Sequence, residues 1–353
     1  MTDRPGPPGP LHHVVEGPLQ PQPPGALQPQ PPVPGAPEPV GALQPQPRNG
    51  GAPEWEGSRP GEPVTGAVHS PGDRPGERPG ESPGDRPGES HGERPSESPG
   101  ERPGGGPRVV LVHGFTQTLA AWGPVGERLA GRWEVVRVDL PGHGGSGRVR
   151  VGFAEAAALV GEAGGAGVYV GYSLGGRLCL RLALDRPDLV RGLVLVGASP
   201  GIADPGARAE RRAADEALAA EIERQGVAAF LERWLAGPLF ATLPAEAAGR
   251  ADRLANTPDG LAYALRRLGT GAQEPLWDRL ATLGPPTLLV AGALDTKFAA
   301  VARQMAAAIG PRARVALVPG AGHAVHLERP AELAALVEEL LDAGLPGPPP
   351  APS

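Results

Sequence analysis

A serine between glycines is the first residue of this chain with a recognisable chemistry. The run Gly171-Tyr172-Ser173-Leu174-Gly175 has the pattern G-x-S-x-G, and it lies between the apolar segment Val168–Val170 and a segment with helical spacing. Glycines around a serine permit a sharp strand-to-helix turn that exposes the hydroxyl at the edge of a sheet. Such a hydroxyl reacts once a neighbouring base takes its proton. The sequence therefore predicts Ser173 as the reactive residue.

The base is expected among eight histidines, of which four precede the apolar part of the chain: His12, His13, His69 and His91. His143 falls in a loop after an expected strand. His323 ends the run Pro319-Gly320-Ala321-Gly322-His323, whose glycines allow the loop to curl back over the serine. His326 competes on sequence alone, and we interpret it as a surface or loop-packing histidine. The sequence favours His323 as the base.

An acid that orients the histidine should follow a strand between the serine and the histidine. Asp295 follows the apolar run Leu288–Gly292 and meets this requirement, whereas Asp185 and Asp188 are interpreted as solvated charges. The order Ser173, Asp295, His323 is the order found in α/β-hydrolases. The three residues are therefore predicted to form one catalytic triad.

Negative charge that develops during a reaction needs fixed hydrogen-bond donors. The run Val112-His113-Gly114-Phe115 ends the first expected strand, in the position of an oxyanion loop. We assign the donors to the backbone N–H groups of Phe115 and Leu174, and we interpret His113 as a structural residue of the loop.

The elements that must position these residues follow a strand–helix alternation, which predicts an α/β-hydrolase fold: a mostly parallel sheet with helices on both faces. Residues 108–345 are the expected domain. Between about 204 and 285 the alternation stops for roughly 80 residues, which predicts a helical cap inserted above the sheet. The expected strands are Arg108–Val112, Glu134–Val138, Val168–Val170, Gly192–Val196, Thr287–Val290 and Arg314–Val318.

The N-terminal part of the chain has a different composition. Of the 353 residues, 54 are glycine and 47 are proline, and both crowd the stretch before Pro107 in repeats such as PGER and GALQPQP. Too few apolar residues are present there to offset the entropy of ordering, so residues 1–107 and 346–353 are predicted to be disordered tails.

Charge and composition also limit the function classes. A net charge of -6 provides no basic field for nucleic acid, and no run is long and apolar enough for a bilayer. We therefore expect a cytoplasmic monomer with a small-molecule substrate, without nucleic acid or membrane partners. No metal or cofactor is expected. The single cysteine, Cys179, is interpreted as a core residue.

Several motifs together resemble one family of α/β-hydrolases, the 2-succinyl-6-hydroxy-2,4-cyclohexadiene-1-carboxylate synthases of menaquinone biosynthesis. The most selective motif is Ser173-Leu174-Gly175-Gly176-Arg177, and the resemblance extends from about Arg108 to Leu341. It implies an elimination of pyruvate from a tricarboxylate, without a covalent acyl intermediate. The resemblance further implies six substrate-binding residues: Tyr172, Arg177, Arg211, Trp234, Arg253 and Lys297.

Two features leave alternatives open. The family opens with a short strand or hairpin before the first parallel strand, and here the repeats occupy that place, so the sheet edge is expected to be incomplete.

A carboxylesterase or C–C bond hydrolase would share the triad but would have no need of an arginine beside the nucleophile. A non-catalytic homologue that serves as a binding protein is the second alternative, and the complete triad speaks against it.

Overall fold

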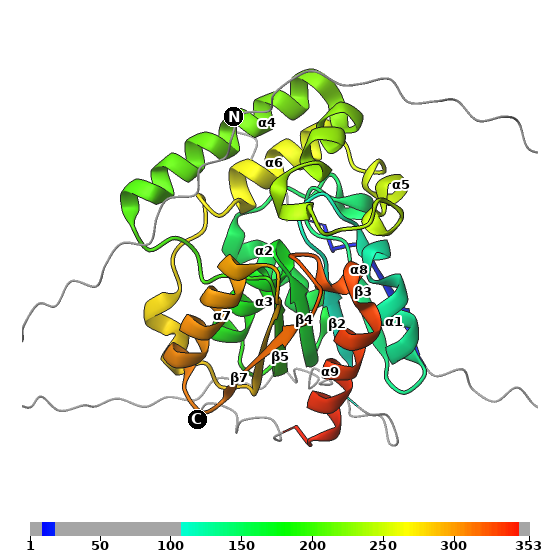
Figure 1. The fold of residues 1–353 in the computed structure, drawn as a ribbon, viewed down its shortest axis with the longest axis vertical. Helices are drawn as coiled ribbons and strands as arrows, with labels where there is room; N and C mark the ends of the chain where they lie inside the picture. The colour runs from blue at the N-terminus through cyan, green and yellow to red at the C-terminus, as the bar shows by residue number, and fades with distance from the viewer. Residues whose placement is uncertain (1–8, 18–106, 346–353) are drawn as a thin grey trace, which may run out of the picture. The chain divides into compact units, whose positions relative to one another are not determined.

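The computed structural model describes residues 9–17 and 107–345, and the sheet formed by these residues has seven strands (Figure 1). The strand order is β1-β3-β2-β4-β5-β6-β7, and all neighbouring strands are parallel except β1 and β3. Six of the strands match the predicted ones to within a few residues. Their bounds are β2 Val109–Val112, β3 Val135–Val138, β4 Gly167–Tyr172, β5 Val190–Val196, β6 Thr287–Gly292 and β7 Ala313–Val318.

Helices cover both faces of the sheet because successive side chains of its buried strands point to opposite faces. In β2, Val110 and Val112 join one core cluster, whereas Val109 and Leu111 join the other. The first cluster includes residues of α2 Phe153–Gly164, α3 Leu174–Asp185 and α7 Thr296–Ile309. The second includes residues of α1 Gly123–Ala130 and α9 Pro330–Asp342. The predicted α/β-hydrolase architecture is confirmed.

The segment between residues 204 and 285, described throughout, contains helices and no strand, in line with the predicted cap. Figure 1 shows α4 and α6 above the sheet. The cap has a small apolar cluster of its own, with Ile222, Phe230 and Leu231 facing Leu261 and Leu265. Its helical elements are α4 Pro205–Leu235, η3 Pro238–Phe240, η4 Ala245–Ala248, α5 Arg250–Arg253, α6 Pro258–Leu268 and η5 Trp277–Thr282.

The prediction of a disordered tail over residues 1–107 is wrong for residues 9–17. His13–Glu16 form β1, which pairs antiparallel with β3 from His13 opposite Val138 to Glu16 opposite Val135. Leu11 is buried in the core cluster that contains α2 and α3, and Arg137 of β3 donates a hydrogen bond to Glu16. The sheet edge is therefore complete. Residues 1–8, 18–106 and 346–353, predicted as tails, lie outside the described residues.

Short helical turns complete the described part of the chain: η1 Leu119–Trp122, η2 Gly144–Ser146 and α8 Val325–Glu328. Cys179 is fully buried among apolar side chains, as predicted. Among the described residues, no helix has the length and apolar character needed to cross a membrane.

Candidate active site

Ser173 lies at the turn between β4 and α3, where the backbone is strained. Its φ of 49° and ψ of -107° are unusual for a residue with a side chain. The neighbouring glycines are required by close contacts, because a Cβ at Gly175 would lie 2.2 Å from the carbonyl oxygen of Val112. A Cβ at Gly171 would lie 2.6 Å from the nitrogen of Gly176. The turn thus holds Ser173 in the position that the motif predicts.

The structure brings Ser173, Asp295 and His323 together from the ends of three strands. His323 Nδ1 lies 2.8 Å from Asp295 Oδ2, and His323 Nε2 lies 3.5 Å from Ser173 Oγ. The second distance is long for a hydrogen bond, as is common in sites without substrate. The carboxylate keeps the proton of the neutral imidazole on Nδ1, which leaves Nε2 free to accept from the serine. With His323 only 3% exposed, the arrangement can transfer a proton away from water.

His326, the competing histidine, has no contact with Ser173 among its hydrogen bonds and ring contacts, and instead packs in the core. Its ring lies 4.1 Å from that of Tyr172 and 4.9 Å from that of Trp122. Its Nε2 lies 2.9 Å from the amide nitrogen of Gln117, and burial lowers the pKa of this histidine well below its usual value. The packing interpretation is therefore supported, although the residue is buried rather than on the surface.

Gln117 is a residue of this region that sequence reasoning missed. Its Oε1 accepts a hydrogen bond of 2.9 Å from the N–H of Gly114, and its amide nitrogen contacts His326. Gln117 thereby supports the loop that carries Phe115. A glutamine in a loop carries no sequence signal for such a role, because its partner His326 is 209 residues away.

The candidate oxyanion donors lie on two structured elements. Leu174 is the first residue of α3, where backbone N–H groups have no partner within the helix. Phe115 follows β2 in a loop that is fixed by histidine nitrogens: Thr116 N–H donates to His143 Nε2 at 3.3 Å, and Leu140 N–H donates to His113 Nε2 at 3.1 Å. Burial lowers the pKa of His143 to about 3 and also lowers that of His113. Both histidines are therefore neutral supports.

Arg177 lies one turn after Ser173 on α3 and is only 8% exposed. Its Nη1 donates to Gln273 Oε1 at 2.8 Å and its Nη2 donates to the carbonyl oxygen of Leu268 at 2.9 Å. Burial and then Arg211 lower its pKa to about 9, and Asp215 acts in the opposite direction. Since both hydrogen-bonded partners are neutral, the guanidinium brings positive charge to the side of the nucleophile.

Arg253 of α5 is the second buried cation, with an exposed fraction of 2%. Its Nε donates to the carbonyl oxygen of Ala248 at 2.7 Å and its Nη1 donates to Thr116 Oγ1, next to Phe115. Its Nη2 is buried without a hydrogen-bond partner among the described residues. Burial lowers the pKa of Arg253 to about 10. Arg211 differs, because it donates at 2.7 Å to the buried carboxylate of Asp215.

The remaining candidate residues surround the triad and the loop. The Trp234 ring lies 5.6 Å from that of Phe115, and its Nε1 is buried without a hydrogen-bond partner among the described residues. The buried Tyr172 ring lies 5.3 Å from that of His323. Lys297 Nζ lies 5.9 Å from the ring of Phe298, which in turn lies 4.6 Å from His323.

Gln273 is a second residue whose role sequence reasoning missed. Its Oε1 accepts from Arg177, while its Nε2 is buried without a hydrogen-bond partner among the described residues. It lies in one of the stretches that carry the family resemblance, but its type alone did not indicate a function.

Comparisons with known proteins agree with this geometry. Residues 109–336 match the model of the alpha/beta hydrolase family. A putative 2-succinyl-6-hydroxy-2,4-cyclohexadiene-1-carboxylate synthase of Bacillus subtilis (strain 168) is 34% identical over 247 residues, 66% of this chain and 89% of the relative. The synthase of Salmonella schwarzengrund (strain CVM19633) is 35% identical over 245 residues, 67% of this chain and 94% of the relative.

Among solved structures, MenH from S. aureus resembles the chain with a TM-score of 0.63 and 31% identity, covering 67% of this chain and 94% of the other. Fold, triad and family model define the protein as a member of the α/β-hydrolase family. Within it, the chain belongs to the family of 2-succinyl-6-hydroxy-2,4-cyclohexadiene-1-carboxylate synthases, as the resemblance of its motifs implied.

Proposed function

We propose that the protein eliminates pyruvate from 2-succinyl-5-enolpyruvyl-6-hydroxy-3-cyclohexene-1-carboxylate and thus acts as a lyase of menaquinone biosynthesis. The observation that carries this proposal is a serine–histidine–aspartate triad together with two buried guanidinium groups: Arg177, one turn after Ser173 on α3, and Arg253, which donates to Thr116 next to Phe115. An esterase for neutral substrates has no use for buried positive charge at this place, whereas a tricarboxylate needs it.

Donors without partners strengthen the argument for an anionic substrate. Buried polar groups in folded proteins are nearly always hydrogen-bonded, so each exception calls for an explanation. Three such donors belong to the same region: Arg253 Nη2, Gln273 Nε2 and Trp234 Nε1. Carboxylate oxygens of a bound substrate would satisfy them, and hydrogen bonds between guanidinium and carboxylate are among the strongest in proteins.

The reaction follows from the triad. His323 Nε2 accepts the proton of Ser173 Oγ as the serine oxygen removes a proton from the substrate ring next to a carbonyl group. The electrons of that C–H bond move toward the carbonyl oxygen, and the N–H groups of Phe115 and Leu174 stabilise the enolate-like charge. The charge then returns to form a double bond from C2 to C3, the double bond of the ring moves to C4–C5, and the C–O bond to enolpyruvate breaks. The imidazolium gives its proton to the methylene carbon of the released enolpyruvate, which becomes pyruvate. Asp295 stabilises the imidazolium throughout.

The other basic and aromatic residues are assigned supporting roles in binding. Trp234 forms part of the aromatic wall with Phe115, and Tyr172 packs behind the triad. Arg211 and Lys297 are assigned to the same substrate by the family resemblance, and Arg211 lies close enough to Arg177 to lower the pKa of that group.

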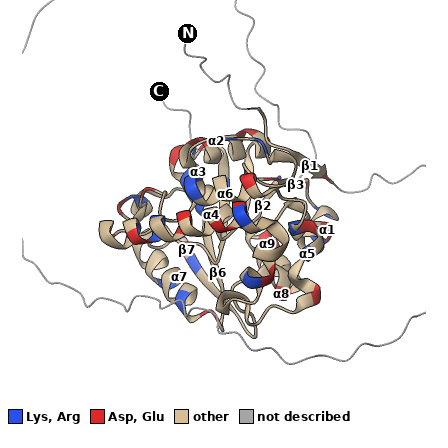
Figure 2. Ribbon diagram, turned by 90° about the horizontal axis from the view of Figure 1, so that it is seen from above, with Lys and Arg blue, Asp and Glu red and all other residues tan. Residues whose placement is uncertain are grey.

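The predictions about partners and cellular location rest on the charge and composition of the sequence. A cytoplasmic monomer that binds no nucleic acid is part of this proposal. Figure 2 supports the last point, because in this view the Lys and Arg of the described residues are interspersed with Asp and Glu over the ribbon.

Incubation of the purified chain with the enolpyruvyl substrate tests the proposal. Pyruvate release is followed with a coupled dehydrogenase, and the ring product by its ultraviolet absorbance. Hydrolysis of neutral p-nitrophenyl esters is measured in parallel. Rapid ester cleavage without any pyruvate release would overturn the lyase proposal and support the carboxylesterase alternative.

A further inference from the structure

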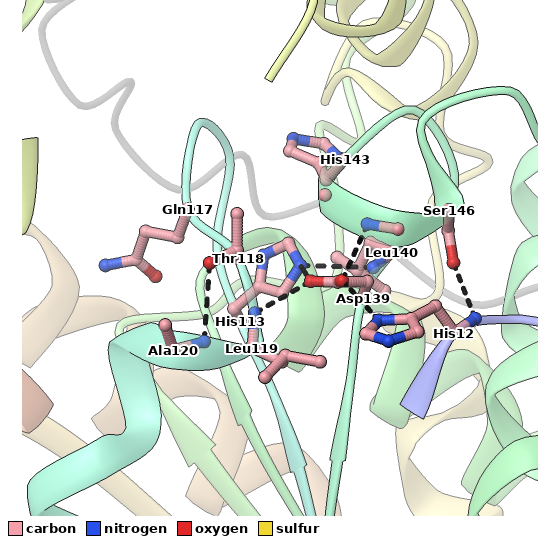
Figure 3. A network of polar contacts seen from close by, with 12 residues as sticks. His12, His113, Gln117, Thr118, Leu119, Ala120, Asp139, Leu140, His143 and Ser146 are labelled. Atoms are coloured by element: carbon pink, nitrogen blue, oxygen red, sulfur yellow. Dashed lines mark hydrogen bonds and ion pairs between the residues drawn. The ribbon is translucent and has the colours of Figure 1, made fainter. Parts of the chain in front are cut away.

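Asp139 connects the loop of the candidate oxyanion donor to two other segments, and none of its contacts has a part in the proposed reaction. Its Oδ1 accepts a hydrogen bond of 2.8 Å from the N–H of Leu119, the residue that ends the loop and begins η1. Its Oδ2 accepts a hydrogen bond of 2.8 Å from the N–H of Gly145 in η2 (Figure 3). The Asp139 carboxylate is almost fully buried.

His12, immediately before β1, is the third partner of this carboxylate. Its Nδ1 lies 2.8 Å from Asp139 Oδ2, and its side chain is 50% exposed on the other side. The backbone of His12 is attached to the same loop, because its N–H donates to Ser146 Oγ at 2.8 Å and its carbonyl accepts from Asp139 N–H at 2.9 Å. Figure 3 shows His12 reaching from the N-terminal segment to Asp139.

The loop from Asp139 to Ser146 in turn fixes the oxyanion loop at three points. The N–H of Leu119 binds Asp139, the N–H of Thr116 binds His143, and His113 Nε2 accepts from the N–H of Leu140. His12 is therefore connected to the loop that carries Phe115 by two hydrogen bonds, one between His12 and Asp139 and one between Asp139 and Leu119.

We propose that His12 is a positioning residue of the active site: it clamps the loop 139–146, and through that loop it holds the Phe115 N–H in place. The proposal rests on the lyase function only in its choice of reaction. Its geometric basis is the carboxylate of Asp139, which binds both His12 and the loop segments. Among the described side chains, only that of His12 is hydrogen-bonded to Asp139 Oδ2.

Gly145 provides an independent way to break the same contact. A Cβ at this position would lie 2.4 Å from Cγ of His12, and its three nearest atoms all belong to the His12 side chain. Because Cβ of His12 would also lie only 2.8 Å away, an alanine at Gly145 would push the imidazole away from Asp139 and displace the His12 backbone with it. Two substitutions on separate segments should thus remove one interaction.

The experiment is a double-mutant cycle in the full chain. We expect His12→Ala and Gly145→Ala each to lower kcat about three- to tenfold, with KM within about twofold of wild type, because the oxyanion donor acts in the transition state. The double variant should be no worse than Gly145→Ala alone, since that substitution already removes the contact between His12 and Asp139. His12→Asn, whose amide can replace Nδ1 as donor, should restore most of kcat.

His13→Ala is the matched control, because His13 is exposed and its ring nitrogen contacts only the carbonyl of Leu11. It should keep wild-type kcat. A wild-type kcat in His12→Ala, even with a lower melting temperature, would overturn the proposal and assign the residue a purely structural role. A double variant whose loss is the product of the two single losses would overturn it as well.

A second readout separates this proposal from the lyase proposal. A fluorophosphonate labels Ser173 through the same oxyanion donors: the Oγ–P bond forms, fluoride leaves and the serine proton passes to His323. Labelling without pyruvate release in wild type would refute the lyase function alone. The labelling rates of the four members of the cycle must then show the same losses, and equal rates in all four would refute the role of His12.

Discussion

The triad and the cation region, which consists of Arg177 on α3 and Arg253 on α5, are two regions that the chain builds in opposite ways. Ser173, His323 and Asp295 lie within hydrogen-bonding distance of one another, so the polar groups of the triad find their partners within the protein. Arg177 and Arg253 are buried, and their hydrogen-bonded partners are carbonyl, amide and hydroxyl groups. The triad residues are thus hydrogen-bonded to one another, whereas neither arginine has a hydrogen-bonded carboxylate among the described residues.

This difference separates what is general in the fold from what is specific. Strand ends and tight turns position a triad regardless of the substrate, and α/β-hydrolases of many activities share it. Burying a cation without a hydrogen-bonded carboxylate costs free energy. The proposal of an anionic substrate therefore depends on Arg177 and Arg253 rather than on the triad.

The largest effects are expected in the triad. Ser173→Ala, His323→Ala and Asp295→Asn should each lower kcat by about 10²–10⁴-fold, because the three groups act as one proton-transfer unit. Melting temperatures measured by circular dichroism should stay close to wild type. Full activity in His323→Ala would transfer the role of base elsewhere, and His326 would be the first residue to examine.

Much of the triad could be predicted from sequence because its signals are local. The G-x-S-x-G turn and the valine-rich strands are read from neighbouring residues, and the order of Ser173, Asp295 and His323 follows from the topology. The contacts of Gln117 and Gln273 could not be predicted, since they join residues 209 and 96 positions apart.

β1 was missed for a related reason. Its four residues, HVVE, are flanked by proline and glycine, and a strand of this length has no periodicity of its own. Its stability comes from pairing with β3 and from the His12–Asp139 contact, whose residues are 127 positions apart. Composition describes the average of a region and does not reveal a short segment that docks.

Arg177 tests the cation region directly. Arg177→Ala should lower kcat/KM for pyruvate release at least about tenfold, the equivalent of roughly 1.5–3 kcal/mol for hydrogen bonds to a charged group. Arg177→Lys should fall between alanine and wild type, because an ammonium group cannot reproduce the two-pronged contact of a guanidinium.

Neutral p-nitrophenyl esters provide the control for Arg177, because they present no carboxylate. Any weak hydrolysis of these esters should change far less than pyruvate release. An equal loss on both substrates would mean that Arg177 supports the helix after Ser173 rather than the substrate.

Acid titration tests the burial of His143, which supports the loop that carries Phe115. His143 has a pKa of about 3 in the folded protein, compared with 6.5 for a free histidine. Between these values the unfolded chain binds more protons, so the free energy of unfolding falls as the pH decreases from 6.5 toward 3. Each such histidine contributes a slope of up to about 1.4 kcal/mol per pH unit.

His143→Gln should remove about one proton from this slope. Urea unfolding at several pH values between 6 and 4.5 measures it. An unaltered slope in His143→Gln would show that His143 is already protonated in the folded protein at these pH values.

The smallest effect is expected from deleting residues 22–100, which lie outside the described residues. Glu16 and Val109 both pair with Val135, so the end of β1 and the start of β2 lie at the same end of the sheet, one on each side of β3. Two strand spacings separate them, about 10 Å, and the roughly thirteen residues that remain can span this distance several times over.

Both kcat and KM for pyruvate release should therefore stay within about twofold of wild type in this deletion variant. The melting temperature should be equal or slightly higher, because a sevenfold shorter connection lowers the entropic free-energy cost of loop closure by about 2 kcal/mol. Deleting residues 9–17 instead removes β1 and His12 and should lower both kcat and the melting temperature. If the deletion of residues 22–100 lowers pyruvate release as strongly, part of that segment contributes to the triad or to the cation region.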